Sequence, residues 1–270
     1  MMAEFKDVFI MELPNIQSEK GLRLWREEII RLKDYLEEKF QVVITDEDVR
    51  QAIRVENHRR QALKRLYEVM KLEPVPIMGM DLLNVLYGSK YRLDTDQVAE
   101  DINLLTGRIL EEYRPDAEKK KKPRILVTGC PIGGDSVKIV RAVEDNGGVV
   151  VAFENCTGAK VIDKLVDEDD PDIYGAIAKK YFYIGCAIMT PNDNRIELLG
   201  RMIDEFCVDG VVEMVLAGCH SVHMESISVR NFVNEEKHIP YIDVVTDYSQ
   251  GDVGQLNTRM SAFIEMLETH

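Results

Sequence analysis

The chain has 270 residues, of which 45% are hydrophobic and 30% charged, a globular composition that excludes a wholly disordered protein. Its 34 basic and 48 acidic residues give a net charge of −14, which disfavours a nucleic-acid groove or an anionic membrane surface as a partner. The chain contains no run of about 20 apolar residues, and its N-terminal MMAEFKDVFIMELPN lacks the basic start and long apolar core of a signal peptide. We therefore expect no membrane span and a cytoplasmic location.

Residues 1–122 are predicted to form a mainly helical region that ends in a linker. Apolar residues recur there at steps of three and four, the spacing of one helical face, and Thr45 followed by three acids is a candidate N-cap. The sequence RPDAEKKKKPR at 114–124 is predicted to be a solvated linker, because four consecutive lysines cannot share a core. We expect these helices to serve as scaffold. They are predicted over residues 19–40, 45–72, 80–86 and 94–113.

Residues 123–270 show a different pattern, in which short β-rich runs alternate with helical ones. Such alternation implies βαβ units and a mostly parallel sheet with helices on both faces. The predicted fold class is therefore α/β: an open flavodoxin/Rossmann-like parallel sheet of four or five strands, preceded by the helical region. Strands are predicted over 124–128, 149–153, 181–184, 211–216 and 241–245. Helices are predicted over 136–146, 160–166, 171–180, 195–206, 224–236 and 252–267.

Four of the five cysteines follow predicted strands, and the fifth does not. The carboxyl ends of parallel strands meet at one edge of an open sheet, the edge where such sheets bind ligands. Each of the four also precedes a predicted helix, whose free N–H groups and dipole stabilise a thiolate or an anionic cluster. Cys207 ends a helix and is predicted to be buried filler. The four at the predicted edge are Cys130, Cys156, Cys186 and Cys219.

Several interpretations of these cysteines remain open. A zinc site is disfavoured because no C-x-x-C pair is present, although Cys219-His220-Ser-Val-His223 offers nitrogen ligands. A catalytic cysteine with His220 or His223 as its base is a second alternative, and unrelated buried thiols are a third. An iron–sulfur cluster fits thiols that are far apart in sequence and converge through the fold, and it is the interpretation we favour. Glu154, His220 and Tyr248 also lie near the predicted edge, where we expect them to be local caps or turn formers.

Five ordered segments resemble the 2-hydroxyacyl-CoA dehydratase D-component/benzoyl-CoA reductase family, most closely its double-cubane-cluster branch. The helical stretches WREEIIRLKDYLEEKF and PIMGMDLLNVLYGSKY also resemble that branch. The resemblance covers nearly the whole chain. The five segments are TGCPIGGD (128–135), ENCTGAK (154–160), CAIMTPN (186–192), AGCHSVHMES (217–226) and TDYSQGDVGQLNTR (246–259).

The resemblance implies a [4Fe-4S] or double-cubane cluster and low-potential electron transfer. Family members receive an electron from a separate ATP-hydrolysing iron–sulfur activator and pass it to an acyl-CoA, in a lyase or reductase reaction typical of anaerobes. Carried over by position, Cys130, Cys156 and Cys219 match the cluster ligands. Cys186 matches the first cysteine of a C-x-C pair whose second place is occupied here by Ile188.

The resemblance also implies a missing part. Family chains carry a further cysteine-bearing domain before the matched region, often with a Cys-Asp-Gly-Lys-Lys stretch that this sequence lacks. We therefore expect a truncated or split subunit that works in a homo- or hetero-oligomer, with a partner chain supplying the missing domain. The expected function is that of an iron–sulfur subunit of a 2-hydroxyacyl-CoA dehydratase-like enzyme. The alternatives are a double-cubane-type reductase of small molecules and a metal-free α/β module without catalytic activity.

Overall fold

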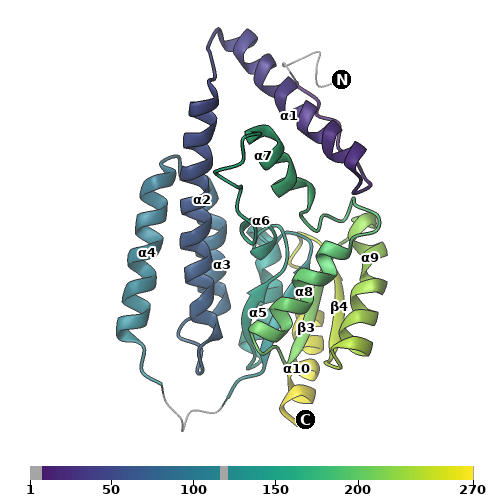
Figure 1. Cartoon of the computed structure of the whole chain (residues 1–270). Coiled ribbons are helices and arrows are strands. Elements are labelled where there is room, and N and C mark those ends of the chain that lie inside the picture. The colour runs from purple at the N-terminus through teal and green to yellow at the C-terminus, as the bar shows by residue number, and fades with distance from the viewer. Residues whose placement is uncertain (1–7, 116–120, 270) are drawn as a thin grey trace. The chain divides into compact units, whose positions relative to one another are not determined.

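The computed structural model describes residues 8–115 and 121–269 (Figure 1). The chain divides into two compact units, each built from separate stretches of sequence. The first comprises Met1–Asn57 and Lys164–Asn192, and the second comprises His58–Asp163 and Asp193–His270. The sequence-based division at 122/123 follows secondary structure instead, and as a domain boundary it stays a prediction. Residues 116–120 of the predicted linker lie outside the described part of the chain.

Two capped helices pack against each other in the first unit: α1 (Glu19–Phe40) and α7 (Ile173–Phe182). Asp172 caps α7 by accepting a hydrogen bond from the Gly175 N–H, and it also pairs with the Arg26 guanidinium of α1 at 2.7–3.0 Å. A Cβ at Gly21 would lie 3.1 Å from the ring of the last residue of α7, so glycine permits the close approach of the two helices. The helix expected over 19–40 is confirmed.

The strand predicted over 181–184 is wrong, because this segment is the end of α7 followed by a turn. The short apolar run YFYI fits a buried helix end as well as a strand, and periodicity does not separate the two. Cys186 consequently follows a helix instead of a strand. Its carbonyl accepts hydrogen bonds from the Met189 N–H at 3.0 Å and the Asn192 amide at 3.0 Å.

The remaining predicted scaffold helices are also present. Helix α2 (Asp46–Glu68) begins in the first unit after Thr45 and continues into the second. The Thr45 hydroxyl accepts from the Asp48 N–H at 3.2 Å, while the Asp48 carboxylate accepts from the Thr45 N–H at 2.8 Å. This reciprocal pair is a capping-box arrangement and confirms the predicted start. Helices α3 (Gly79–Gly88) and α4 (Thr95–Glu112) follow in the second unit, with Asp94 as the cap of α4.

A four-stranded, wholly parallel sheet forms the core of the second unit. Its strand order β2-β1-β3-β4 confirms the α/β, flavodoxin-like prediction. Every residue of β1 and β2 is buried, as expected for strands covered on both faces, whereas edge strand β4 is half exposed. The strands are β1 (Arg124–Gly129), β2 (Val149–Phe153), β3 (Gly210–Leu216) and β4 (Tyr241–Thr246).

Helices cover this sheet on both faces: α8 crosses in front of β3 in Figure 1, and α10 runs behind the strands. Helix α10 packs against α5, and α9 packs against β3 and β4. Helix α6 is one turn long, shorter than predicted, and α9 begins four residues earlier than predicted, which makes Cys219 its N-cap. The covering helices are α5 (Lys138–Asp145), α6 (Ala159–Ile162), α8 (Asp193–Glu205), α9 (His220–Asn231) and α10 (Val253–Thr269).

Cys207 is exposed, so its predicted role as buried filler is wrong. It lies just past α8 in the left-handed backbone region, with φ of 47°. The Val208 N–H reaches back to the Ile203 carbonyl at 3.1 Å, the bond that closes a Schellman-type helix end. This backbone conformation turns the Cys207 side chain toward solvent at the amino end of β3.

None of the helices in residues 8–115 and 121–269 combines the length and apolar character that a bilayer crossing requires.

Candidate functional site

Three neighbouring strands each end close to a cysteine. Cys130 follows β1 directly, Cys156 lies three residues beyond the end of β2, and Cys219 lies three residues beyond the end of β3. Because β2, β1 and β3 are adjacent and parallel, their carboxyl ends lie at the same edge of the sheet. The topology thus brings three of the four predicted positions to one edge.

The sulfurs of Cys130 and Cys219 are close enough for each to shift the pKa of the other. Cys130 continues the ladder of β1, because its N–H donates to the Met214 carbonyl at 2.8 Å, and its Sγ accepts from the Leu216 N–H at 3.3 Å. It is 1% exposed. Gly129, with φ of 99°, permits this close pairing, because a Cβ there would lie 2.2 Å from the Met214 carbonyl oxygen.

The two thiols of this pair differ in acidity. Burial raises the pKa of Cys130 to about 11, and the neighbouring Cys219 sulfur contributes to the rise. Burial also opposes ionisation of Cys219, but the Val222 N–H, the Cys130 thiol and the Ser221 hydroxyl together lower the pKa of Cys219 below its ordinary value. The N–H donor belongs to the first turn of α9, where the helix dipole favours a thiolate.

Cys156 lies in a loop held by contacts on two sides. The Lys90 ammonium donates to the Cys156 carbonyl at 2.8 Å, and burial lowers the pKa of Lys90. The Thr157 hydroxyl accepts from the Ile132 N–H at 2.9 Å and donates to the Ile132 carbonyl at 2.8 Å, which joins this loop to the loop after β1. The side-chain oxygen of Asn155 accepts from two backbone N–H groups of the loop. The buried side-chain nitrogen of Asn155 has no hydrogen-bond partner among the described residues.

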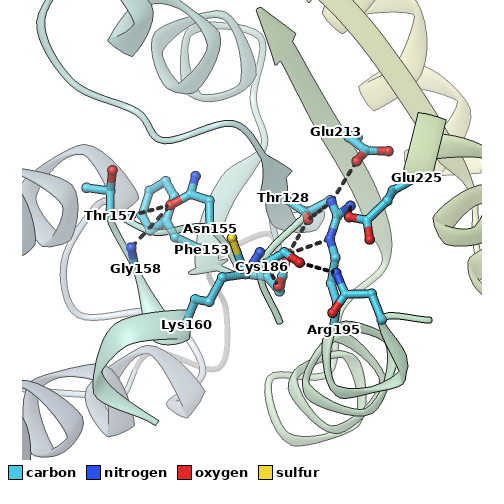
Figure 2. A network of polar contacts seen from close by, with 12 residues as sticks. Thr128, Phe153, Asn155, Thr157, Gly158, Lys160, Cys186, Arg195, Glu213 and Glu225 are labelled. Carbon is cyan, nitrogen blue, oxygen red and sulfur yellow. Dashed lines mark hydrogen bonds and ion pairs between the residues drawn. The ribbon is translucent and has the colours of Figure 1, made fainter. Parts of the chain in front are cut away.

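Beneath these loops lies a buried charge network centred on Arg195 of α8 (Figure 2). Its guanidinium donates to Glu213 at 2.7 Å, to Glu225 at 2.7 Å and to the Thr128 hydroxyl at 3.1 Å. Its Nε lies 3.5 Å from a Glu154 carboxylate oxygen. Arg195 is 1% exposed, and Glu154 and Glu213 are fully buried. Since an unpaired buried charge is costly, these groups depend on one another.

Glu154 is therefore not the local cap or turn former that the sequence suggested. Its carboxylate accepts a short hydrogen bond from the Thr128 hydroxyl and forms an ion pair with Lys160 at 3.2 Å. Lys160 is itself 6% exposed. At the other side of the network, the Tyr241 hydroxyl donates to Glu213. Burial, and then the Glu213 charge, raises the pKa of Tyr241 well above its ordinary range.

The remaining predicted residues have different settings. Cys186 belongs to the first compact unit, so its membership in the site stays a prediction. His220 and His223 are exposed on the first turn of α9, and within the described residues neither imidazole hydrogen-bonds to a thiol. Tyr248 is exposed in the loop after β4.

The donor set fits an iron–sulfur cluster in chemistry and, in part, in geometry. Three cysteines come to one sheet edge, and the sulfurs of two of them shift each other's pKa there. Within residues 8–115 and 121–269, no group of three or more His, Cys, Asp or Glu side chains is placed to hold a metal ion. Among the predicted ligands, Cys130 and Cys219 are the two whose sulfurs are neighbours, and Cys156 lies at the same edge of the sheet.

Sequence reasoning missed the Arg195 network. One signal was present in the sequence, because Glu213 interrupts the apolar strand VVEMVL and a charge inside a fully buried strand requires a partner. Arg195 itself carried no such signal, since a charged residue in the first turn of a helix is usually solvated. Only the tertiary structure identifies it as the partner.

The fold and site define an α/β protein with three cysteines at the carboxyl edge of its parallel sheet, and the comparisons with known proteins give its family. The chain belongs to the family "2-hydroxyglutaryl-CoA dehydratase, D-component", whose model matches residues 1–267. It is 44% identical to the putative dehydratase subunit YjiM of Escherichia coli (strain K12) over 267 residues, 98% of this chain and 70% of that protein. It is 23% identical to one of the benzoyl-CoA reductase subunits of Thauera aromatica over 188 residues, 64% of this chain and 42% of that protein.

Proposed function

We propose that this chain is an iron–sulfur subunit of a 2-hydroxyacyl-CoA dehydratase-like enzyme. The observation that carries the proposal is the placement of Cys130, Cys156 and Cys219 at the carboxyl ends of three adjacent parallel strands. Cysteine thiolates are the usual ligands of iron–sulfur clusters. Membership in a dehydratase family supports the reaction class.

Cys130, Cys156 and Cys219 would hold the cluster, with Cys186 as a further candidate ligand. When bound, the cluster would supply one-electron chemistry at low potential. The protein's own groups prepare the site for an anionic cofactor. At the start of α9, the Val222 N–H favours the ionised form of Cys219, and the buried surroundings of Cys130 exclude water from its sulfur.

The partners we propose follow from the family. The matching model is described as one component, and both relatives are named as subunits. We propose that the chain acts with a second component and receives electrons from an ATP-hydrolysing activator, with an acyl-CoA thioester as substrate. We assign no general acid or base, because His220 and His223 both lie exposed on the first turn of α9.

The test is anaerobic purification and reconstitution with iron and sulfide, followed by iron and sulfide analysis. We expect a brown protein that absorbs at about 400 nm through thiolate–iron charge transfer. Cys130→Ser, Cys156→Ser and Cys219→Ser should each remove most of the bound iron, whereas the matched control Cys207→Ser should retain it. A wild-type chain that stays colourless and iron-free, alone and with its partner component, would overturn the proposal.

A second candidate is a metal-free α/β module that acts in assembly. It is favoured by the setting of Cys130, whose buried sulfur already accepts a hydrogen bond from the Leu216 N–H, as a structural thiol would. The same experiment separates the two candidates. A metal-free module would bind its partner component equally well with and without the cysteines, as measured by co-purification.

A further inference from the structure

We infer that Arg195 is the positioning residue that sets the relative places of the three cysteine-bearing loops. This inference rests on the proposed function for its consequence, cluster binding. Its structural part concerns the apo chain and is tested separately. Arg195 carries no thiol and is not itself a candidate ligand; it acts through the segments that carry the cysteines.

One guanidinium contacts all three segments. Thr128 lies in β1 two residues before Cys130, and its hydroxyl accepts from Arg195 at 3.1 Å. Glu154 lies two residues before Cys156, and its carboxylate is 3.5 Å from the Arg195 Nε.

The third segment is held on both sides of its cysteine. Glu213 of β3 lies before Cys219 and Glu225 of α9 lies after it, and each carboxylate accepts from Arg195 at 2.7 Å. The two residues clamp the turn between β3 and α9, whose apex is Gly218 with φ of 86°. Arg195 therefore fixes the strand before Cys219 and the helix after it.

The planar guanidinium suits this role because its five donors point in fixed directions. An ammonium group at the same place is a single point charge and cannot donate in the fixed directions of Thr128, Glu213 and Glu225 while its charge also lies beside Glu154. The burial of Arg195 adds stiffness, since nothing from solvent competes for its donors. Groups outside the ligand shell that orient the ligands in this way commonly change metal affinity by about 10- to 100-fold when removed.

Arg124 provides a matched control in the same sheet. It is a buried arginine at the amino end of β1, 6% exposed, and its side chain donates to the carbonyls of Met70 at 2.6 Å and Phe206 at 2.8 Å. Among the described residues, its hydrogen bonds reach none of the cysteine-bearing loops. Arg124→Lys therefore reproduces the loss of a buried guanidinium without touching the cysteine edge.

The first measurement uses the apo protein. Alkylation of each cysteine by iodoacetamide is followed by mass spectrometry in the wild type, Arg195→Lys and Arg124→Lys, with an added unstructured cysteine peptide as the reference thiol, because Arg124 contacts the residue before Cys207. We expect Arg195→Lys to raise the alkylation rates of Cys130, Cys156 and Cys219 together relative to the reference peptide, and Arg124→Lys to leave these three ratios unchanged. The two variants are compared at denaturant concentrations that give them the same free energy of unfolding. The inference would be overturned if the three alkylation ratios were then equal in Arg195→Lys and Arg124→Lys.

The second measurement is iron and sulfide uptake by the full chain. Arg195→Lys should weaken uptake by about tenfold or more, while Arg124→Lys should leave it near the wild-type level. If Arg195→Lys does not fold, Thr128→Val supplies the test. It removes the hydroxyl that accepts from Arg195 and donates to Glu154, and it should raise the alkylation rate of Cys130 by a larger factor than that of Cys219. If the wild type binds no iron, the proposed function fails, and the alkylation pattern alone decides whether Arg195 positions the loops.

Discussion

The two ends of the central sheet are each closed by a buried arginine, but with opposite chemistry. At the amino end, the Arg124 side chain donates mainly to neutral carbonyls that terminate helical segments, and it pairs with the solvent-exposed Glu73 carboxylate at 3.4 Å. Its backbone N–H donates to Asp209 at 2.8 Å. At the carboxyl end, Arg195 is surrounded by three carboxylates and lies beneath three cysteine-bearing loops. The amino end satisfies backbone groups and is structural. The carboxyl end concentrates charge and thiols, as expected of a functional edge.

The largest expected difference is in stability. Arg195→Met should lower the free energy of unfolding by about 3–5 kcal/mol, because it leaves Glu154 and Glu213 buried without their shared cation. Arg124→Met should cost about 1–3 kcal/mol, because it leaves neutral carbonyls unpaired. Urea denaturation of both variants measures the difference. A cost for Arg124→Met equal to that for Arg195→Met would remove the contrast between the two ends.

A second prediction concerns alkaline pH. Burial, and then Glu213, raises the pKa of Tyr241, and burial raises that of Tyr67, whose hydroxyl contacts the backbone of Phe153. A raised pKa means that the folded state holds the proton more tightly, so this stability is complete below the ordinary tyrosine pKa of about 10. It falls as pH rises above that value, by about 1.4 kcal/mol per pH unit for each tyrosine.

Tyr241→Phe isolates the contribution of Tyr241 to that alkaline loss. The variant should lose about 1–2 kcal/mol at neutral pH, since Glu213 loses a donor. It should also show a shallower decline of stability above pH of about 10. Urea denaturation at several pH values measures both effects. An unchanged alkaline slope would show that Tyr241 does not titrate in the folded protein as its surroundings imply.

A third, smaller effect is expected at acid pH. Burial opposes ionisation of Asp252, but Lys138 and the Thr246 hydroxyl outweigh it and lower the pKa of Asp252. A lowered pKa gives stability that is present above the ordinary Asp pKa of about 3.9 and is lost as pH falls through the folded value. Lys138→Met should cost about 1 kcal/mol near neutrality and should lose less further stability below a pH of about 4 than the wild type. Parallel acid titrations followed by circular dichroism measure this.

The smallest effect concerns the cysteine at the amino end. Cys207→Gly should raise the free energy of unfolding by less than about 1 kcal/mol, because glycine adopts the left-handed conformation at φ of 47° without steric cost. Iron uptake should not change. Reduced iron content in this variant would contradict the assignment of the functional thiols to the carboxyl edge alone.

Much of the fold was predictable because its signals are local. These signals depend only on neighbouring residues, and all are confirmed. They are the three- and four-residue spacing of apolar residues in α1, the cap at Thr45 and the apolar runs of β1 and β2. The strand over 181–184 failed because a four-residue apolar run has too little periodicity to separate a strand from a helix end. The prediction that Cys207 is buried failed because its exposure depends on the left-handed backbone conformation of Cys207, which no feature of the sequence indicates.

The candidate site was predictable only in part. The positions of Cys130, Cys156 and Cys219 after predicted strands placed them at the carboxyl edge of the sheet. This was possible because parallel topology follows from the alternation of strands and helices. The pairing of Cys130 with Cys219 depends on strand order, since β3 lies beside β1 although β2, several helices and the whole 164–192 segment separate them in sequence.

By itself, the sequence determined the α/β class, the parallel sheet and the thiols at its carboxyl edge, because each follows from residue type and spacing along the chain. Only the tertiary structure decided which two thiols meet and which buried cation lies beneath all three loops. The physical reason is that the partners of a buried charge are set by distance in the folded structure and not by separation along the sequence. Arg195 finds Thr128, Glu154, Glu213 and Glu225 in segments that are distant along the chain and become neighbours only once the sheet has formed.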